Sequence, residues 1–129
     1  MTPEADQHLA KARQSLFKAG KMLTAELPDE AGRMAYLAGF HAAQALIFER
    51  TGRTPKTHRG VRSQFGSLAI TEPRITPSMR RFLTRGYDIK SLADYAIGVD
   101  AVVPVQEAIN AIETATLFVE CIAELLADA

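Results

Sequence analysis

The stretch from Met34 to Phe48 constrains the fold more than any other part of the chain, because nearly every face of a helix built from it is apolar. Only Gly39, His41 and Gln44 interrupt the apolar residues. A helix that is hydrophobic all round is stable only when other elements surround it. The sequence therefore predicts that a helix over residues 29–51 forms the buried centre of a bundle, with Gly39 as a point of close helix contact.

Hydrophobic periodicity predicts further helices and no strand. The expected helices span about residues 3–25, 29–51, 58–70, 77–97 and 102–127. Typical helix starts occur at Thr2, Thr57 and Thr76, and a typical helix end at Gly52. We therefore expect one all-α domain over residues 1–129, an up-and-down bundle of about five helices. The helices over 29–51 and 77–97 are expected to be its central, antiparallel neighbours.

Composition narrows the class of protein. A chain of 129 residues is long enough for one core, and no apolar run approaches the roughly 20 residues that span a bilayer. The acidic start, Met1 to Asp6, does not resemble a secretory signal. Cys121 is the only cysteine, and the histidines are dispersed. We expect a cytoplasmic protein without a disulfide, a metal, a cofactor or a membrane partner.

Charge is unevenly distributed although the net charge is zero. The segment from Arg50 to Lys90 holds ten of the fifteen Lys and Arg residues but only two acids. From Ala96 onward there are six acids and no Lys or Arg. The basic middle is suited to an anionic ligand such as RNA or a nucleotide. Attraction between the two halves, or to a second subunit, is an equally good explanation of the same pattern.

Three stretches carry a resemblance to a known family. They are Tyr36-x3-Phe40-His41-Ala-Ala, Lys56-Thr-His58-x-Gly60-Val and Ala93-Asp94-Tyr95. Together, over about residues 8–125, they resemble the HEPN domain, in particular its small stand-alone branch with an Ala-Asp-Tyr signature. The resemblance implies a bundle similar to nucleotidyltransferase substrate-binding domains. It also implies a homodimer, often paired with a minimal nucleotidyltransferase partner in a toxin–antitoxin or defence module.

The resemblance bears on chemistry as well. Some HEPN proteins are metal-independent endoribonucleases with an Arg-x4–6-His motif late in the fourth helix. Here the helix over 77–97 has no histidine, and Lys90 stands where this branch more often has arginine. We therefore expect a subunit that binds nucleotide, RNA or its nucleotidyltransferase partner and is not an efficient nuclease. The alternatives are an active ribonuclease toxin that uses His41, or His58 with Arg62, and a purely structural dimerisation module.

Two groups of residues are candidates for ligand or phosphate binding. Tyr87, Lys90 and Asp94 share one face of the helix over 77–97, although a Lys–Asp pair on a solvated face explains that spacing equally well. The second group, at the start of the helix over 58–70, comprises Lys56, His58, Arg59 and Arg62. Cations beside free N–H groups of a helix start favour an anion, and a solvated helix end is the alternative.

Supporting roles are expected for four residues, Arg33, Tyr36, His41 and Tyr95. A lone histidine in a buried helix, such as His41, is more often a hydrogen-bonded core residue than a catalyst. An arginine at a helix interface requires a carboxylate. We expect Asp94 to pair with Arg33, which would leave Lys90 free for an anion.

Overall fold

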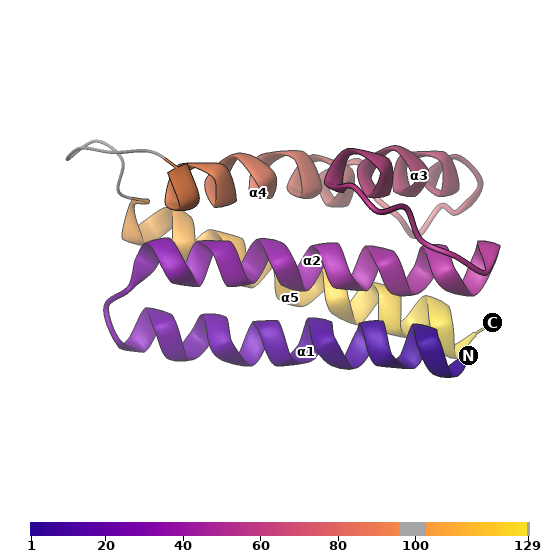
Figure 1. The fold of residues 1–129 in the computed structure, drawn as a ribbon, viewed down its shortest axis with the longest axis horizontal. Helices are drawn as coiled ribbons and strands as arrows, with labels where there is room; N and C mark the ends of the chain where they lie inside the picture. Colours follow the sequence, from indigo (N-terminus) through magenta and orange to yellow (C-terminus); the bar gives the residue numbers. More distant parts are fainter. Residues whose placement is uncertain (96–102, 129) are drawn as a thin grey trace.

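The computed structural model describes residues 1–95 and 103–128, except for the side chains of Leu92, Ala93 and Tyr95. Over this part of the chain the protein has five helices and no strand (Figure 1). They are α1 (Pro3–Thr24), α2 (Pro28–Thr51), α3 (His58–Thr71), α4 (Pro77–Tyr95) and α5 (Val105–Ala127). The all-α prediction is confirmed. The expected end of the fourth helix at 97 and start of the fifth at 102 lie outside the described residues.

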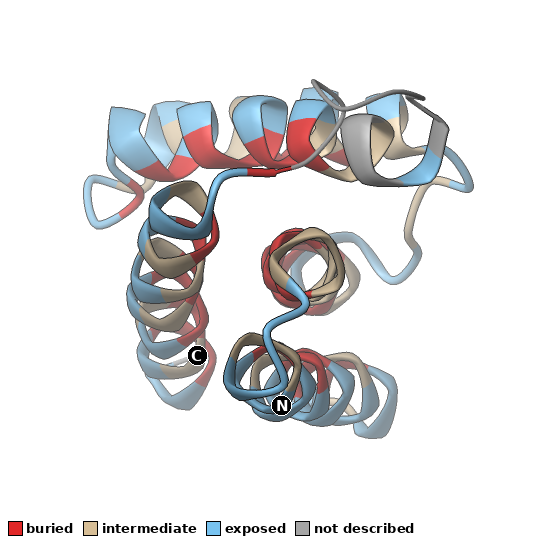
Figure 2. Ribbon diagram, turned by 90° about the vertical axis from the view of Figure 1, so that its left-hand side faces the viewer, coloured by how far each residue is buried: buried red, intermediate tan, exposed pale blue. Residues whose placement is uncertain are grey.

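Helix α2 is the centre of the bundle, as predicted. It packs against each of the other four helices, and Figure 2 shows the buried surfaces of the outer helices turned toward it. In Figure 1, α1 and α4 run antiparallel to α2, and α5 runs in the same direction as α2. The expectation that the fourth helix is also central is wrong. One face of α4 is exposed because Arg80, Arg81 and Arg85 occupy it.

The helix ends follow the local chemistry expected from the sequence. The side-chain oxygens of Thr2, Thr57 and Thr76 each accept a hydrogen bond from the backbone N–H three residues later, at 3.2, 2.9 and 3.3 Å. These bonds satisfy N–H groups that a helix start leaves without a partner. Gly52 ends α2 with a φ of 82°, a left-handed conformation that glycine adopts without strain.

Close contact between α2 and α4 depends on glycines, two of which face an aromatic ring of the other helix. A Cβ on Gly39 would lie 2.5 Å from the ring of Phe82, which confirms Gly39 as a point of helix contact. On the other helix, a Cβ on Gly86 would lie 2.7 Å from the ring of Tyr36. Each glycine therefore makes room for an aromatic ring of the facing helix, and the second contact seats Tyr36 between α2 and α4.

Candidate functional site

Four rings from three helices meet on the side of α2 that α3 and α4 cover. They are Tyr36 and Phe40 of α2, His58 of α3 and Tyr87 of α4, and we call them the aromatic–histidine cluster. The ring centre of His58 lies 4.4 Å from that of Phe40, 5.7 Å from Tyr36 and 5.5 Å from Tyr87. Tyr36 is fully buried, whereas His58 and Tyr87 are half-buried. The imidazole is thus held among three aromatic rings and remains partly accessible.

A hydrogen bond fixes the histidine. The hydroxyl oxygen of Tyr36 lies 2.7 Å from Nδ1 of His58. Burial raises the pKa of Tyr36 far above its ordinary value, and this outweighs the lowering effect of the positive charge of Arg62. Tyr36 is therefore a neutral phenol at any physiological pH.

Two cations flank the same imidazole. The guanidinium carbon of Arg62 lies 4.7 Å from the centre of the Tyr87 ring, close enough for a cation–π contact. Burial lowers the pKa of His58, and the charges of Lys90 and Arg62 lower it further. His58 is consequently neutral near pH 7, and the positive charge at this place belongs to Arg62 and Lys90.

Asp94 joins the end of α4 to α2. Its carboxylate pairs with Lys90 one turn earlier, and its Oδ1 lies 3.7 Å from Nε of Arg33. Arg33 also donates to Oε2 of Glu30 at 3.0 Å. The predicted Arg33–Asp94 pair is confirmed. The expectation that Lys90 stays free is wrong. Asp94 lies four residues later on the same helix face and pairs with Lys90 as well as with Arg33.

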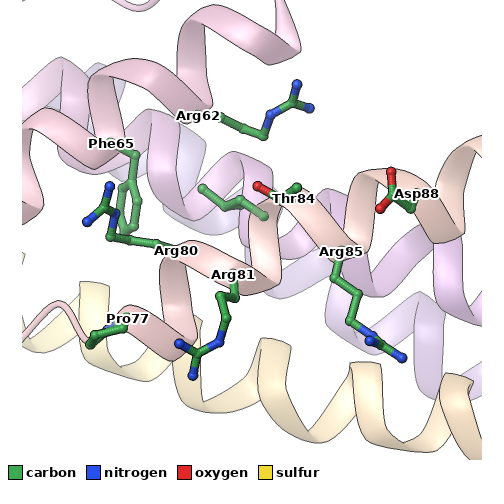
Figure 3. A pocket seen from close by; sticks show the side chains of 9 residues that line it. Arg62, Phe65, Pro77, Arg80, Arg81, Thr84, Arg85 and Asp88 are labelled. Carbon is green, nitrogen blue, oxygen red and sulfur yellow. The ribbon is translucent and has the colours of Figure 1, made fainter.

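A basic cleft lies between α3 and α4, with a volume of about 600 Å³. We call it the arginine cleft, and define it by Arg62, Phe65, Arg80, Arg81, Leu83 and Arg85. Figure 3 shows Arg62 extending from α3 and the other three arginines from α4, with Arg80 beside Phe65. Arg80, Arg81 and Arg85 belong to the basic middle of the sequence, where no motif distinguishes them from the other cations. Their spacing, which places them on one exposed side of a helix, was the sequence signal that could have indicated this cleft.

The remaining candidates are not part of this arrangement. Lys56 and Arg59 are exposed, and no interaction joins them to the cluster within the described residues. His41 pairs through Nδ1 with Oε1 of Gln44 at 2.9 Å, as expected of a core histidine, and lines a different pocket with His8. The side chain of Tyr95 lies outside the described ones. The described residues contain no group of three metal-ligating side chains.

Comparison with known proteins adds two findings. A family model described as the HEPN domain matches residues 5–125. A curated protein of Methanocaldococcus jannaschii, named a "putative toxin", is 31% identical over 115 residues, which cover 89% of this chain and 83% of that protein. No helix in the described ranges is long and apolar enough to cross a membrane.

Proposed function

This chain belongs to the HEPN domain family, and we propose that it is a toxin-type subunit that binds RNA at the aromatic–histidine cluster without cutting it through His58. The observation that carries the proposal is the Tyr36–His58 hydrogen bond, beside which the positive charges of Lys90 and Arg62 act on the imidazole. The similarity to a protein named a "putative toxin" supports the toxin-type role.

The hydrogen bond determines which nitrogen of His58 carries the proton. The hydroxyl of a fully buried tyrosine needs an acceptor. Arg62 has only donors to offer, so among the described partners the acceptor is Nδ1 of His58. Burial raises the pKa of Tyr36 by more than the positive charge of Arg62 lowers it. A neutral imidazole that accepts at Nδ1 carries its proton at Nε2.

This protonation state suits phosphate binding better than cleavage. The Nε2–H group of His58 can donate to a phosphate oxygen, and positive charge beside it favours the anion. Asp94 and Glu30 together balance Arg33 and Lys90, so the positive charge that favours an anion here is that of Arg62. A general base for RNA cleavage needs an unprotonated nitrogen within reach of the ribose hydroxyl. The unprotonated nitrogen of His58 is already engaged by Tyr36.

Two substitutions of His58 test the proposal. Fluorescence anisotropy with a labelled ten-nucleotide single-stranded RNA measures binding, and a denaturing gel measures cleavage. His58→Ala should weaken binding by about tenfold, because a hydrogen bond to a charged group is lost. His58→Gln retains an N–H donor near the position of Nε2 and should stay within about threefold of the unaltered protein. RNA should remain intact in every sample.

A different result is that the unaltered protein cleaves the RNA while both His58 variants fail to do so. That result would establish the ribonuclease alternative in place of this proposal. Failure of the unaltered protein to bind RNA would overturn it altogether.

The resemblance to HEPN proteins supports a partner, which forms the second part of the proposal. We propose that the chain functions beside a minimal nucleotidyltransferase in a toxin–antitoxin pair. Expression of the chain alone should then arrest growth, and co-expression of its minimal nucleotidyltransferase partner should restore growth. Normal growth in both conditions would contradict the pairing.

A further inference from the structure

The arginine cleft adjoins the aromatic–histidine cluster through one shared side chain. Arg62 lies over the ring of Tyr87 and also lines the cleft. Its Nη1 is buried and has no hydrogen-bond partner among the described residues. A buried guanidinium donor without an acceptor is unfavourable, so rotation of the Arg62 side chain toward an oxygen of a bound ligand would be favoured. The cluster and the cleft therefore form one continuous surface.

The charges around the cleft have little internal compensation. Arg80 and Arg81 have no ion-pair partner within the described part of the chain, and Arg85 pairs only with Glu107, at 3.3 Å on the exposed surface. Asp88 is the only acidic residue among those that line the cleft. Figure 3 shows the arginine side chains spread around the cleft, and several positive charges with so little compensation favour the approach of an anion.

The packing of α3 on α4 shapes the cleft. Phe65 and Leu83 contribute apolar lining to the cleft, and Figure 3 shows the guanidinium group of Arg80 beside the ring of Phe65. A Cβ on Gly66 would lie 3.3 Å from Nη2 of Arg80, so the glycine leaves space for this guanidinium beside α3. Apolar walls and planar cations together suit a nucleotide, whose ribose and base pack on the walls while its phosphate meets the arginines.

We infer that the arginine cleft is a second phosphate subsite for the same RNA strand, and that the ligand is an extended, single-stranded RNA segment. This inference rests on the proposed RNA-binding function and specifies its substrate class. A nucleoside monophosphate has one phosphate and cannot reach both subsites. A duplex carries its phosphates around the outside of a wide, rigid cylinder, which cannot enter a cleft between two packed helices. A single strand can place successive phosphates at the cluster and in the cleft.

Charge reversal in the cleft tests the inference. The variant is Arg80→Glu with Arg81→Glu, and the matched control is Arg13→Glu with Lys18→Glu, since all four side chains are exposed and the control pair lies on α1. Binding of the labelled ten-nucleotide single strand is measured over a range of salt concentrations, with circular dichroism to verify the fold. The cleft variant should bind at least about tenfold more weakly, and its salt dependence should fall by about two counterions. The control should change little.

Competition identifies the ligand. Unlabelled single strand should displace the probe at much lower concentration than either a duplex of the same sequence or adenosine triphosphate. Equal competition by the duplex would overturn the single-strand assignment. Adenosine triphosphate could instead compete strongly with the probe on the unaltered protein but not on the cleft variant. That result would assign the cleft to a compact polyphosphate. If the cleft variant binds the strand normally, the second subsite is wrong although the RNA-binding function stands. If the unaltered protein binds no RNA, both fail.

Discussion

Tyr36 shapes the candidate site through its size as well as through its hydroxyl group. Its ring fills the space that Gly86 leaves on α4, and this fit places the hydroxyl 2.7 Å from His58. The position of the imidazole therefore depends on a packing contact on the opposite side of the tyrosine. At the scale of single residues, packing and hydrogen bonding at this site are coupled.

Gly86→Ala should destabilise the protein by about 1–3 kcal/mol, because the added methyl group would lie 2.7 Å from the Tyr36 ring inside a packed interface. Gly20→Ala is the matched control, since a Cβ there has no atom outside its own helix within 4 Å. The control should stabilise α1 by about 0.5–1 kcal/mol. Urea unfolding measures both changes, and equal effects of the two substitutions would contradict the packing argument.

The two faces of α4 differ sharply in polarity. Its inner face packs on α2 through Phe82, Leu83 and Ile89, and its outer face supplies three arginines to the cleft. Near its end, Asp94 ties this helix to Arg33 of α2. The helix thus has a packed face, a charged face and an ionic link to α2.

Asp94→Asn should lower the free energy of unfolding by about 1–2 kcal/mol, because Arg33 and Lys90 lose a shared charged partner. Asp88→Asn is the control on the same helix. Asp88 is exposed and has no ion pair within the described residues, so the change should stay within about 0.5 kcal/mol. Chemical denaturation compares the two variants. An Asp94→Asn protein as stable as the control would show that the link to α2 contributes nothing.

For the molecule as a whole, the three histidines make stability depend on pH. Burial is the largest cause that lowers the pKa of His8, His41 and His58 below the ordinary value of 6.5. As pH falls through about 6.5, the unfolded chain takes up protons before the folded one, so unfolding becomes more favourable. Stability present above this pH is therefore lost as the pH falls through the folded-state pKa values.

Calorimetry should show a melting temperature several degrees lower at about pH 5.5 than at about pH 7.5. His41→Gln should reduce this difference, because one group with a lowered pKa no longer titrates. The same difference in the variant would exclude His41 as a contributor.

Assembly is the other property of the whole molecule, and the homodimer remains a prediction. Light scattering should give twice the 14.1 kDa of one chain. If the basic face of one protomer meets the acidic helix α5 of another, added salt should shift the mass toward one chain. A single-chain mass at high protein concentration and low salt would contradict the prediction.

The sequence by itself determined the five helices, the threonine-capped starts of three of them and the central place of α2. Local rules decide a threonine cap such as Thr57, and a helix apolar on all sides has only one stable environment, the centre. The Arg33–Asp94 pair was also predictable, because a partly buried arginine calls for a carboxylate.

Only the tertiary structure decided which candidate residues meet. His58 and Arg62 turn toward Tyr36 and Tyr87, while Lys56 and Arg59 of the same basic stretch remain exposed. The aromatic–histidine cluster draws its residues from three helices, and Tyr36 and His58 are 22 residues apart in the sequence. Periodicity within one helix defines which residues share a face, but the neighbour of that face is set by how the helices pack. For the same reason, the arginine cleft appears only when α3 lies against α4.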